Sequence, residues 1–212
     1  GYPAGGGSDF LARTVGAQMA EQLKQPVIVD NKPGAAGMIG ADIAAKSAAD
    51  GYTLFTADNG ILIYNPVLYK RVPYSVERDF APLGLVARVP LVLVATAGAG
   101  PSSGAELISA LKASPGKYSY ASPGNGSPHH LAMELFKSHA GVFATHIPYR
   151  GAAPAMQDVM GGQVPLMVVD TSTAMPHIRS GKLVALMGFS ARRLAQLPDV
   201  PTARELGLKD VE

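Results

Sequence analysis

Apolar residues in the second half of the chain follow two alternating patterns. Short, almost wholly apolar runs at 91–96 and 166–169 predict buried strands. Between such runs, Leu107, Ile108 and Leu111 recur at helical spacing within residues 103–113. Regular alternation of strands and helices indicates an α/β fold with a mostly parallel sheet.

The same patterns extend along the whole chain. Helices are expected at about 8–24, 38–48, 61–69 (interrupted at Asn65-Pro66), 103–113, from 128, and at 153–160, 175–180 and 198–206. Strands are expected at 27–30, 52–57, 82–86, 91–96, 118–121, 146–148, 166–169 and 184–189. Pro90 weakens any continuous central strand across 82–96, so this region is interpreted as the crossing between two lobes, residues 1–89 and 90–212.

A glycine-rich loop joins an expected strand to an expected helix in the second lobe. The residues SPGNG at 122–126 cannot continue a regular element. Ser127 is a natural N-cap, and Pro128 suits the first helical position. The first turn of a helix presents unpaired amides and a partial positive charge, which together form an anion site.

A second loop of this kind opens the chain. Residues 3–9, PAGGGSD, precede a helix whose stripe contains Leu11, Val15 and Leu23, with Ser8 or Asp9 as the expected N-cap. Each loop alone is also compatible with an ordinary turn of an α/β protein. Together they suggest a ligand whose anionic groups are held between the two lobes.

Composition narrows the possible functions. The 212 residues are 47% hydrophobic and 16% charged, which argues against disorder. A formal net charge of +2 gives no support for nucleic-acid binding. The absence of cysteine excludes thiolate metal sites and a cysteine nucleophile, and no apolar run approaches the ~18 residues of a membrane span.

Several longer segments resemble one known family. They are PAGGGSDFLAR (3–13), PVIVDNKPGAAGMIGA (26–41), DGYTLF (50–55), NPVLYKRVPYSVERDFAPL (65–83), PGKYSYASPGNGSPHHLAMELFK (115–137), HIPYRGAAPAMQDVMGGQV (146–164), HIRSGKLVALM (177–187) and LPDVPTARELG (197–207). In this order they resemble the Bug, or TctC-like, family of substrate-binding receptors of tripartite tricarboxylate transporters.

The resemblance implies a fold like that of type II periplasmic binding proteins, with two α/β lobes and mostly parallel sheets around a cleft. It implies that lobe one lacks its first strand and its C-terminal portion here. It also implies a periplasmic monomer without catalytic activity, cofactor or nucleic-acid partner. Such a receptor binds a small carboxylate (a di- or tricarboxylate, an aromatic acid or an acidic amino acid) and delivers it to membrane transporter subunits.

The residues expected to bind this ligand lie in loops at the ends of strands. Glycines allow close approach of the backbone, and the carboxylate of Asp170 would influence ligand choice because it repels a second ligand carboxylate. No catalytic residue or metal ligand is expected. The ligand-binding candidates are Ala4, Gly5, Gly6, Ser8, Asp9, Ala57, Asn59, Ser122, Asn125, Gly126, Ser127, His130 and Asp170.

Two other functions remain open at this point. An α/β enzyme acting on an anionic substrate would also use glycine-rich loops, but the chain contains no P-loop, no G-x-S-x-G and no H-E-x-x-H motif. A binding protein that signals to a partner would use the same ligand-driven closure as a transport receptor. The sequence does not separate these last two functions.

Overall fold

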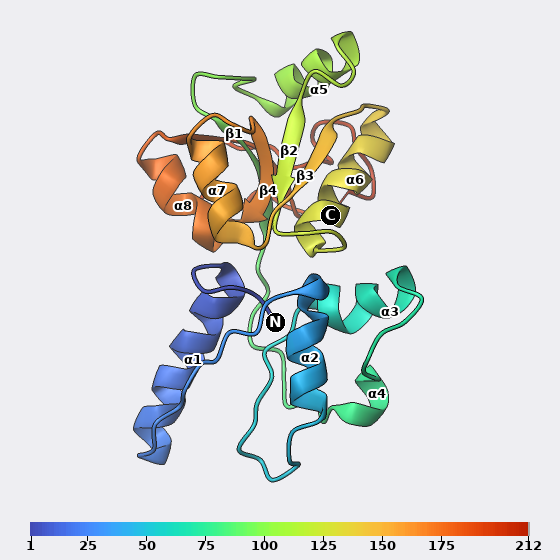
Figure 1. The fold of residues 1–212 in the computed structure, drawn as a ribbon. Coiled ribbons are helices and arrows are strands. Elements are labelled where there is room, and N and C mark those ends of the chain that lie inside the picture. Colours follow the sequence, from blue (N-terminus) through green and yellow to red (C-terminus); the bar gives the residue numbers. More distant parts are fainter. Residues whose placement is uncertain (212) are drawn as a thin grey trace. The chain divides into compact units, whose positions relative to one another are not determined.

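The chain divides into two units, of which unit 1 is Gly1–Arg88 and unit 2 begins at Val89. The computed structural model describes residues 1–211 (Figure 1). Each unit is described by itself.

A five-stranded sheet forms the centre of unit 2. Its strands are β1 (Leu91–Thr96), β2 (Ser119–Ser122), β3 (Thr145–Pro148), β4 (Leu166–Asp170) and β5 (Leu183–Phe189). They lie in the order β3-β2-β4-β1-β5. The strand β2 is parallel to β3 and β4, whereas β1 is antiparallel to β4 and β5. Only β1 is therefore reversed, and the carboxyl ends of the other four strands share one edge of the sheet with the start of β1.

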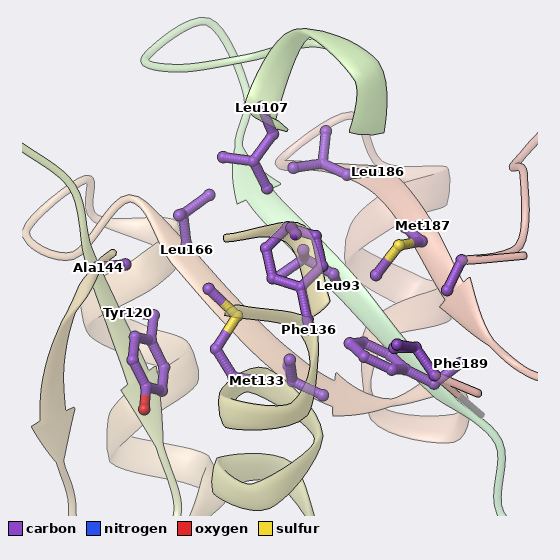
Figure 2. Packing of buried hydrophobic residues seen from close by; sticks show 14 of the residues in the cluster. Leu93, Leu107, Tyr120, Met133, Phe136, Ala144, Leu166, Leu186, Met187 and Phe189 are labelled. Atoms are coloured by element: carbon purple, nitrogen blue, oxygen red, sulfur yellow. The ribbon is translucent and has the colours of Figure 1, made fainter. Parts of the chain in front are cut away.

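Helices cover both faces of this sheet. On one face, α5 (Gly104–Ala113) and α6 (Pro128–Ala140) pack against a core that includes Leu93, Phe136 and Leu186. Figure 2 shows Phe136 of α6 beside Leu93 of β1, with Met133 of the same helix on the side of Tyr120 and Leu166. On the other face, α7 (Ala152–Met160) and α8 (Thr171–Arg179) pack against a second core. The expected α/β layering of this unit is confirmed.

The expected last helix at 198–206 is wrong. Thr202 Oγ1 accepts from the amide of Glu205 at 3.2 Å, and the Glu205 carboxylate accepts from the amide of Thr202 at 2.8 Å, as in a capping box. The segment is nevertheless a turn. Gly207 follows with φ of +86°, which ends the segment before a helix can continue.

Unit 1 is helical in the described residues. It contains α1 (Gly7–Leu23), a 3₁₀ turn η1 (Ala35–Gly37), α2 (Met38–Ala45), a π-helical segment η2 (Gly60–Tyr64), α3 (Asn65–Leu68) and α4 (Val76–Asp79). The expected helix at 61–69 is formed by η2 and α3, and at Asn65, where an interruption was expected, the chain changes from π-helical to α-helical hydrogen bonding. The side-chain amide of Asn65 donates to the carbonyl of Ala36 at 2.9 Å. A small core around Ile61 and Tyr74 holds these segments together.

The strands expected at 27–30, 52–57 and 82–86 are not formed. Their apolar side chains are largely exposed, at 85% for Ile28, 93% for Tyr52 and 83% for Leu83. A strand needs a neighbour to receive its backbone hydrogen bonds, and no described segment of unit 1 pairs with these runs. The expected parallel sheet of this lobe is therefore absent from the described residues.

Candidate functional site

The loop between β2 and α6 has the geometry that its glycines predict. The φ values of Gly124 (+143°) and Gly126 (+74°) are ones that residues with a Cβ rarely adopt. Ser127 caps α6, because its Oγ accepts from the amide of His130 at 3.2 Å, and Pro128 takes the first helical position. The predicted helix start is confirmed.

Several polar groups of this loop bond to one another, which the sequence did not reveal. The Gly124 amide donates to Ser122 Oγ (3.2 Å), the Ser127 amide to the Gly124 carbonyl (3.3 Å), and the Gly126 amide to Nδ1 of His130 (3.2 Å). The Gly124 and Gly126 amides therefore already have acceptors. Ligand roles for Ser122, Asn125, Gly126, Ser127 and His130 stay predictions.

Asp170 lies at the same edge of the sheet, at the end of β4 and the start of α8. Its Oδ2 accepts from the hydroxyl of Thr173 at 2.7 Å, and its Oδ1 lies 3.6 Å from Nε2 of His129. Burial opposes ionisation of this carboxyl, but His129 and Thr173 outweigh it and lower its pKa. Asp170 is therefore an anion held beside an imidazole.

His129 is not among the ligand-binding candidates predicted from the sequence. The prediction favoured its neighbour His130 as the ligand-binding histidine, but it is His129 that faces Asp170. Both ring nitrogens of His129 are buried and lack a hydrogen-bond partner among the described residues. The only signal in the sequence is its place in the first turn of α6.

In unit 1, the start of α1 differs in detail from the prediction. The N-cap is Gly6, without a side-chain cap, and not Ser8 or Asp9. Asp9 is buried and accepts three hydrogen bonds at 3.0 Å each, from the Gly5 amide, Arg13 Nε and Asn31 Nδ2.

These contacts place a stabilised anion in the first turn of α1. Arg13 lowers the pKa of Asp9 most, burial opposes it, and the bonds from Gly5 and Asn31 bring the pKa to about 2. The Gly5 amide is therefore already occupied. No described residue accepts a hydrogen bond from the amides of Gly7 and Ser8, which remain directed out of the helix start.

The loop at 57–60 is tied to this region within unit 1. Asp58, and not the predicted neighbours Ala57 and Asn59, makes the polar contacts: its Oδ1 accepts from the Tyr2 hydroxyl at 3.2 Å and from the Ile61 amide at 3.1 Å. The Tyr2 carbonyl in turn accepts from Asn31. Ala57 packs on the unit 1 core, and the roles proposed for Ala4, Ala57 and Asn59 stay predictions.

Each unit, taken by itself, thus presents a helix start flanked by polar loops. Among residues 1–211, no three histidine or acidic side chains converge as a metal site would require. Within the same residues, no helix has both the length and the apolar character to traverse a bilayer.

Solved structures share this fold. The chain superposes with a TM-score of 0.95 and 35% identity on Rpa4515 of R. palustris with adipate, covering 99% of this chain and 70% of that one. It superposes with a TM-score of 0.90 and 33% identity on MatC from Rhodopseudomonas palustris with bound malate, covering 98% and 70%. The chain therefore has the α/β periplasmic binding protein fold, and it spans 70% of the length of each of these two chains.

The family follows from the sequence comparisons. The family described as "Tripartite tricarboxylate transporter family receptor" (TctC) matches residues 11–212. Protein BugT of Bordetella pertussis is 41% identical over 207 residues, which are 97% of this chain and 64% of BugT. The chain belongs to the TctC, or Bug, family of receptors, which are binding proteins and not enzymes. It spans a little under two thirds of the curated relative's length.

Proposed function

We propose that the full-length protein is a periplasmic receptor that binds a small dicarboxylate and delivers it to a tripartite transporter in the membrane. Two similar structures contain dicarboxylates, adipate in one and malate in the other. Family membership supports the transporter as partner and the periplasm as location.

The observation that carries the proposal is the start of α1. The amides of Gly7 and Ser8 have no acceptor among the described residues, and the 17-residue helix behind them adds a partial positive charge. The Asp9 carboxylate in the same turn is already paired with the Arg13 guanidinium and accepts a hydrogen bond from Asn31. A ligand carboxylate can therefore bind at this helix start without pairing with a Lys or Arg side chain of the protein.

Unit 2 supplies the features that would select among carboxylates. A ligand carboxylate beside Asp170 would be repelled, whereas a ligand hydroxyl could donate to that carboxylate. The imidazole of His129, 3.6 Å from Asp170 Oδ1, would reduce the repulsion. We therefore expect a preference for ligands with a hydroxyl or ammonium group near one carboxylate.

Titration calorimetry on the full-length protein tests the proposal. The ligands are adipate, malate, citrate, benzoate, glutamate and the monoamide of adipic acid, with sucrose as an uncharged control. We expect binding of at least one dicarboxylate, and loss of about tenfold or more in affinity when one carboxylate becomes an amide, since hydrogen bonds to a charged group contribute about 1.5–3 kcal/mol. Binding of sucrose alone would reject the proposal.

A further inference from the structure

Three aromatic rings lie together beneath the loop that joins β2 and α6. The ring of His146 on β3 is 4.1 Å from that of His130 on α6 and 4.9 Å from that of Tyr120 on β2, measured between ring centroids. The ring planes differ by only 21° and 19°, so the rings are stacked. The function proposed above leaves this cluster without a role.

Each of the two histidines holds one end of the loop. Nε2 of His146 lies 2.6 Å from Oγ of Ser122, the last residue of β2, which is fully buried. Nδ1 of His130 accepts the hydrogen bond from the Gly126 amide at 3.2 Å. An amide can only donate, so Nδ1 of His130 must be unprotonated for this bond to exist.

The charged groups that face the pair, Glu134 and Lys137, both lie on α6, and β2 adds the uncharged hydroxyl of Tyr120. Glu134 Oε1 lies 3.9 Å from Nε2 of His130, but the same oxygen accepts from Lys137 Nζ at 2.6 Å and from the Tyr120 hydroxyl. Lys137 therefore offsets much of the negative charge of Glu134, which reduces the attraction of that carboxylate for protonated imidazoles.

This environment favours neutral imidazoles. Burial lowers the pKa of His130, with Glu134 opposing and Lys137 adding to the effect. Burial, followed by the neighbouring His130, lowers the pKa of His146 to about 4. Two stacked rings at this distance are not both cationic imidazolium groups near neutral pH, because like charges repel.

We propose that His130 and His146 are positioning residues that hold the loop 122–127 in its binding shape only while both are neutral, so that ligand affinity falls in acid. The inference rests on the proposed function, because it assigns that loop to the ligand. Protonation of His130 at Nδ1 removes the acceptor of the Gly126 amide, and protonation of His146 places a second charge against the first.

The first test needs no ligand. In the ¹⁵N- and ¹³C-labelled full-length protein, pH titration by NMR from 8 to 4 follows the His130 imidazole and the Gly126 amide. We expect the amide to move with the same midpoint as the imidazole. An amide that stays in place while the imidazole titrates would overturn the inference, whatever the protein binds.

The second test measures the affinity for adipate, or for the strongest ligand of the calorimetric panel, at pH 7.5 and pH 5. His130→Asn keeps an acceptor close to the position of Nδ1 but does not titrate, and His139→Gln on the exposed part of α6 is the matched control. Because dicarboxylates themselves gain protons in this range, variants are compared at equal pH.

Wild type and His139→Gln should lose at least about threefold more affinity between the two pH values than His130→Asn. Equal losses in all three proteins would overturn the inference. Absence of binding to any carboxylate at pH 7.5 would instead reject the proposed function, and the ligand-free titration would still decide the role of the histidines. His146→Gln, which keeps a polar group near Ser122, provides the corresponding variant at the other end of the loop.

Discussion

Replacing the Asp9 carboxylate by an amide gives a sharp test of how the start of α1 is built. Asp9→Asn retains the size of the side chain but removes the charge that accepts from Gly5, Arg13 and Asn31. The NH₂ group of the asparagine also faces hydrogen-bond donors, since Gly5, Arg13 and Asn31 all donate to this side chain in the wild type. We expect the variant to lose stability at neutral pH and to order the loop before α1 less well.

The magnitude follows from the pKa of Asp9. The difference between the ordinary value of 3.8 and about 2 in the folded protein corresponds to about 2 kcal/mol. Arg13 is half exposed, at 53%, so solvent screens part of this interaction and about 1 kcal/mol is the expected loss. Because the folded pKa is lowered, this stability is present above pH 3.8 and is lost as the pH falls through about 2.

The assay is urea unfolding of the full-length protein followed by NMR signals of unit 1, between pH 7 and pH 2. The stability difference between wild type and Asp9→Asn should shrink towards pH 2. The matched control is Asp30→Asn, which breaks an exposed ion pair with Lys32 and should change stability by less than about 0.5 kcal/mol. Equal effects of the two substitutions, or an Asp9 carboxyl that titrates near 3.8, would refute the reasoning.

Two further predictions concern glycines. Gly7→Pro removes one backbone amide at the first position of α1, where proline is well tolerated. Calorimetry should show dicarboxylate binding at least about tenfold weaker than in Gly7→Ala, because the ligand loses a hydrogen-bond donor. Equal affinities of the two variants would contradict a role for that amide. Gly104→Val brings a Cβ to 2.5 Å from Leu206 Cδ1 and 2.7 Å from the Leu186 carbonyl, so it should lower the free energy of unfolding by about 1–3 kcal/mol, whereas Gly100→Ala, with no atom within 4 Å, should leave it nearly unchanged in the same unfolding experiment.

Unit 2 could be predicted closely from the sequence because its signals are local. All five residues of β4, the apolar run 166–169 and Asp170, are buried, and Ser127 with Pro128 marks the start of α6 unambiguously. The reversed direction of β1 could not be predicted, since strand direction depends on where the chain enters the sheet. The helix predicted at 198–206 was wrong although Thr202 forms a capping box, because a favourable helix start does not ensure a helix when Gly207 follows closely.

The prediction of strands in unit 1 was wrong for a physical reason that local sequence patterns do not report. Residues 27–30 and 52–57 have the apolar composition of strands, but a strand forms only with a partner for its hydrogen bonds, and the described residues supply none. Prediction of the polar site also required contacts between residues that are far apart in the sequence. The sequence pointed to the two loops, but the pairing of His129 with Asp170 joins residues that are 41 positions apart.

The most direct test of the account is a ligand titration in which NMR follows the backbone amides of the ¹⁵N-labelled full-length protein as adipate or malate is added. The account predicts the largest changes at Gly7 and Ser8 and in the first turn of α6. Largest changes on the strands or at helix ends remote from these positions, with Gly7 and Ser8 unaffected, would contradict it.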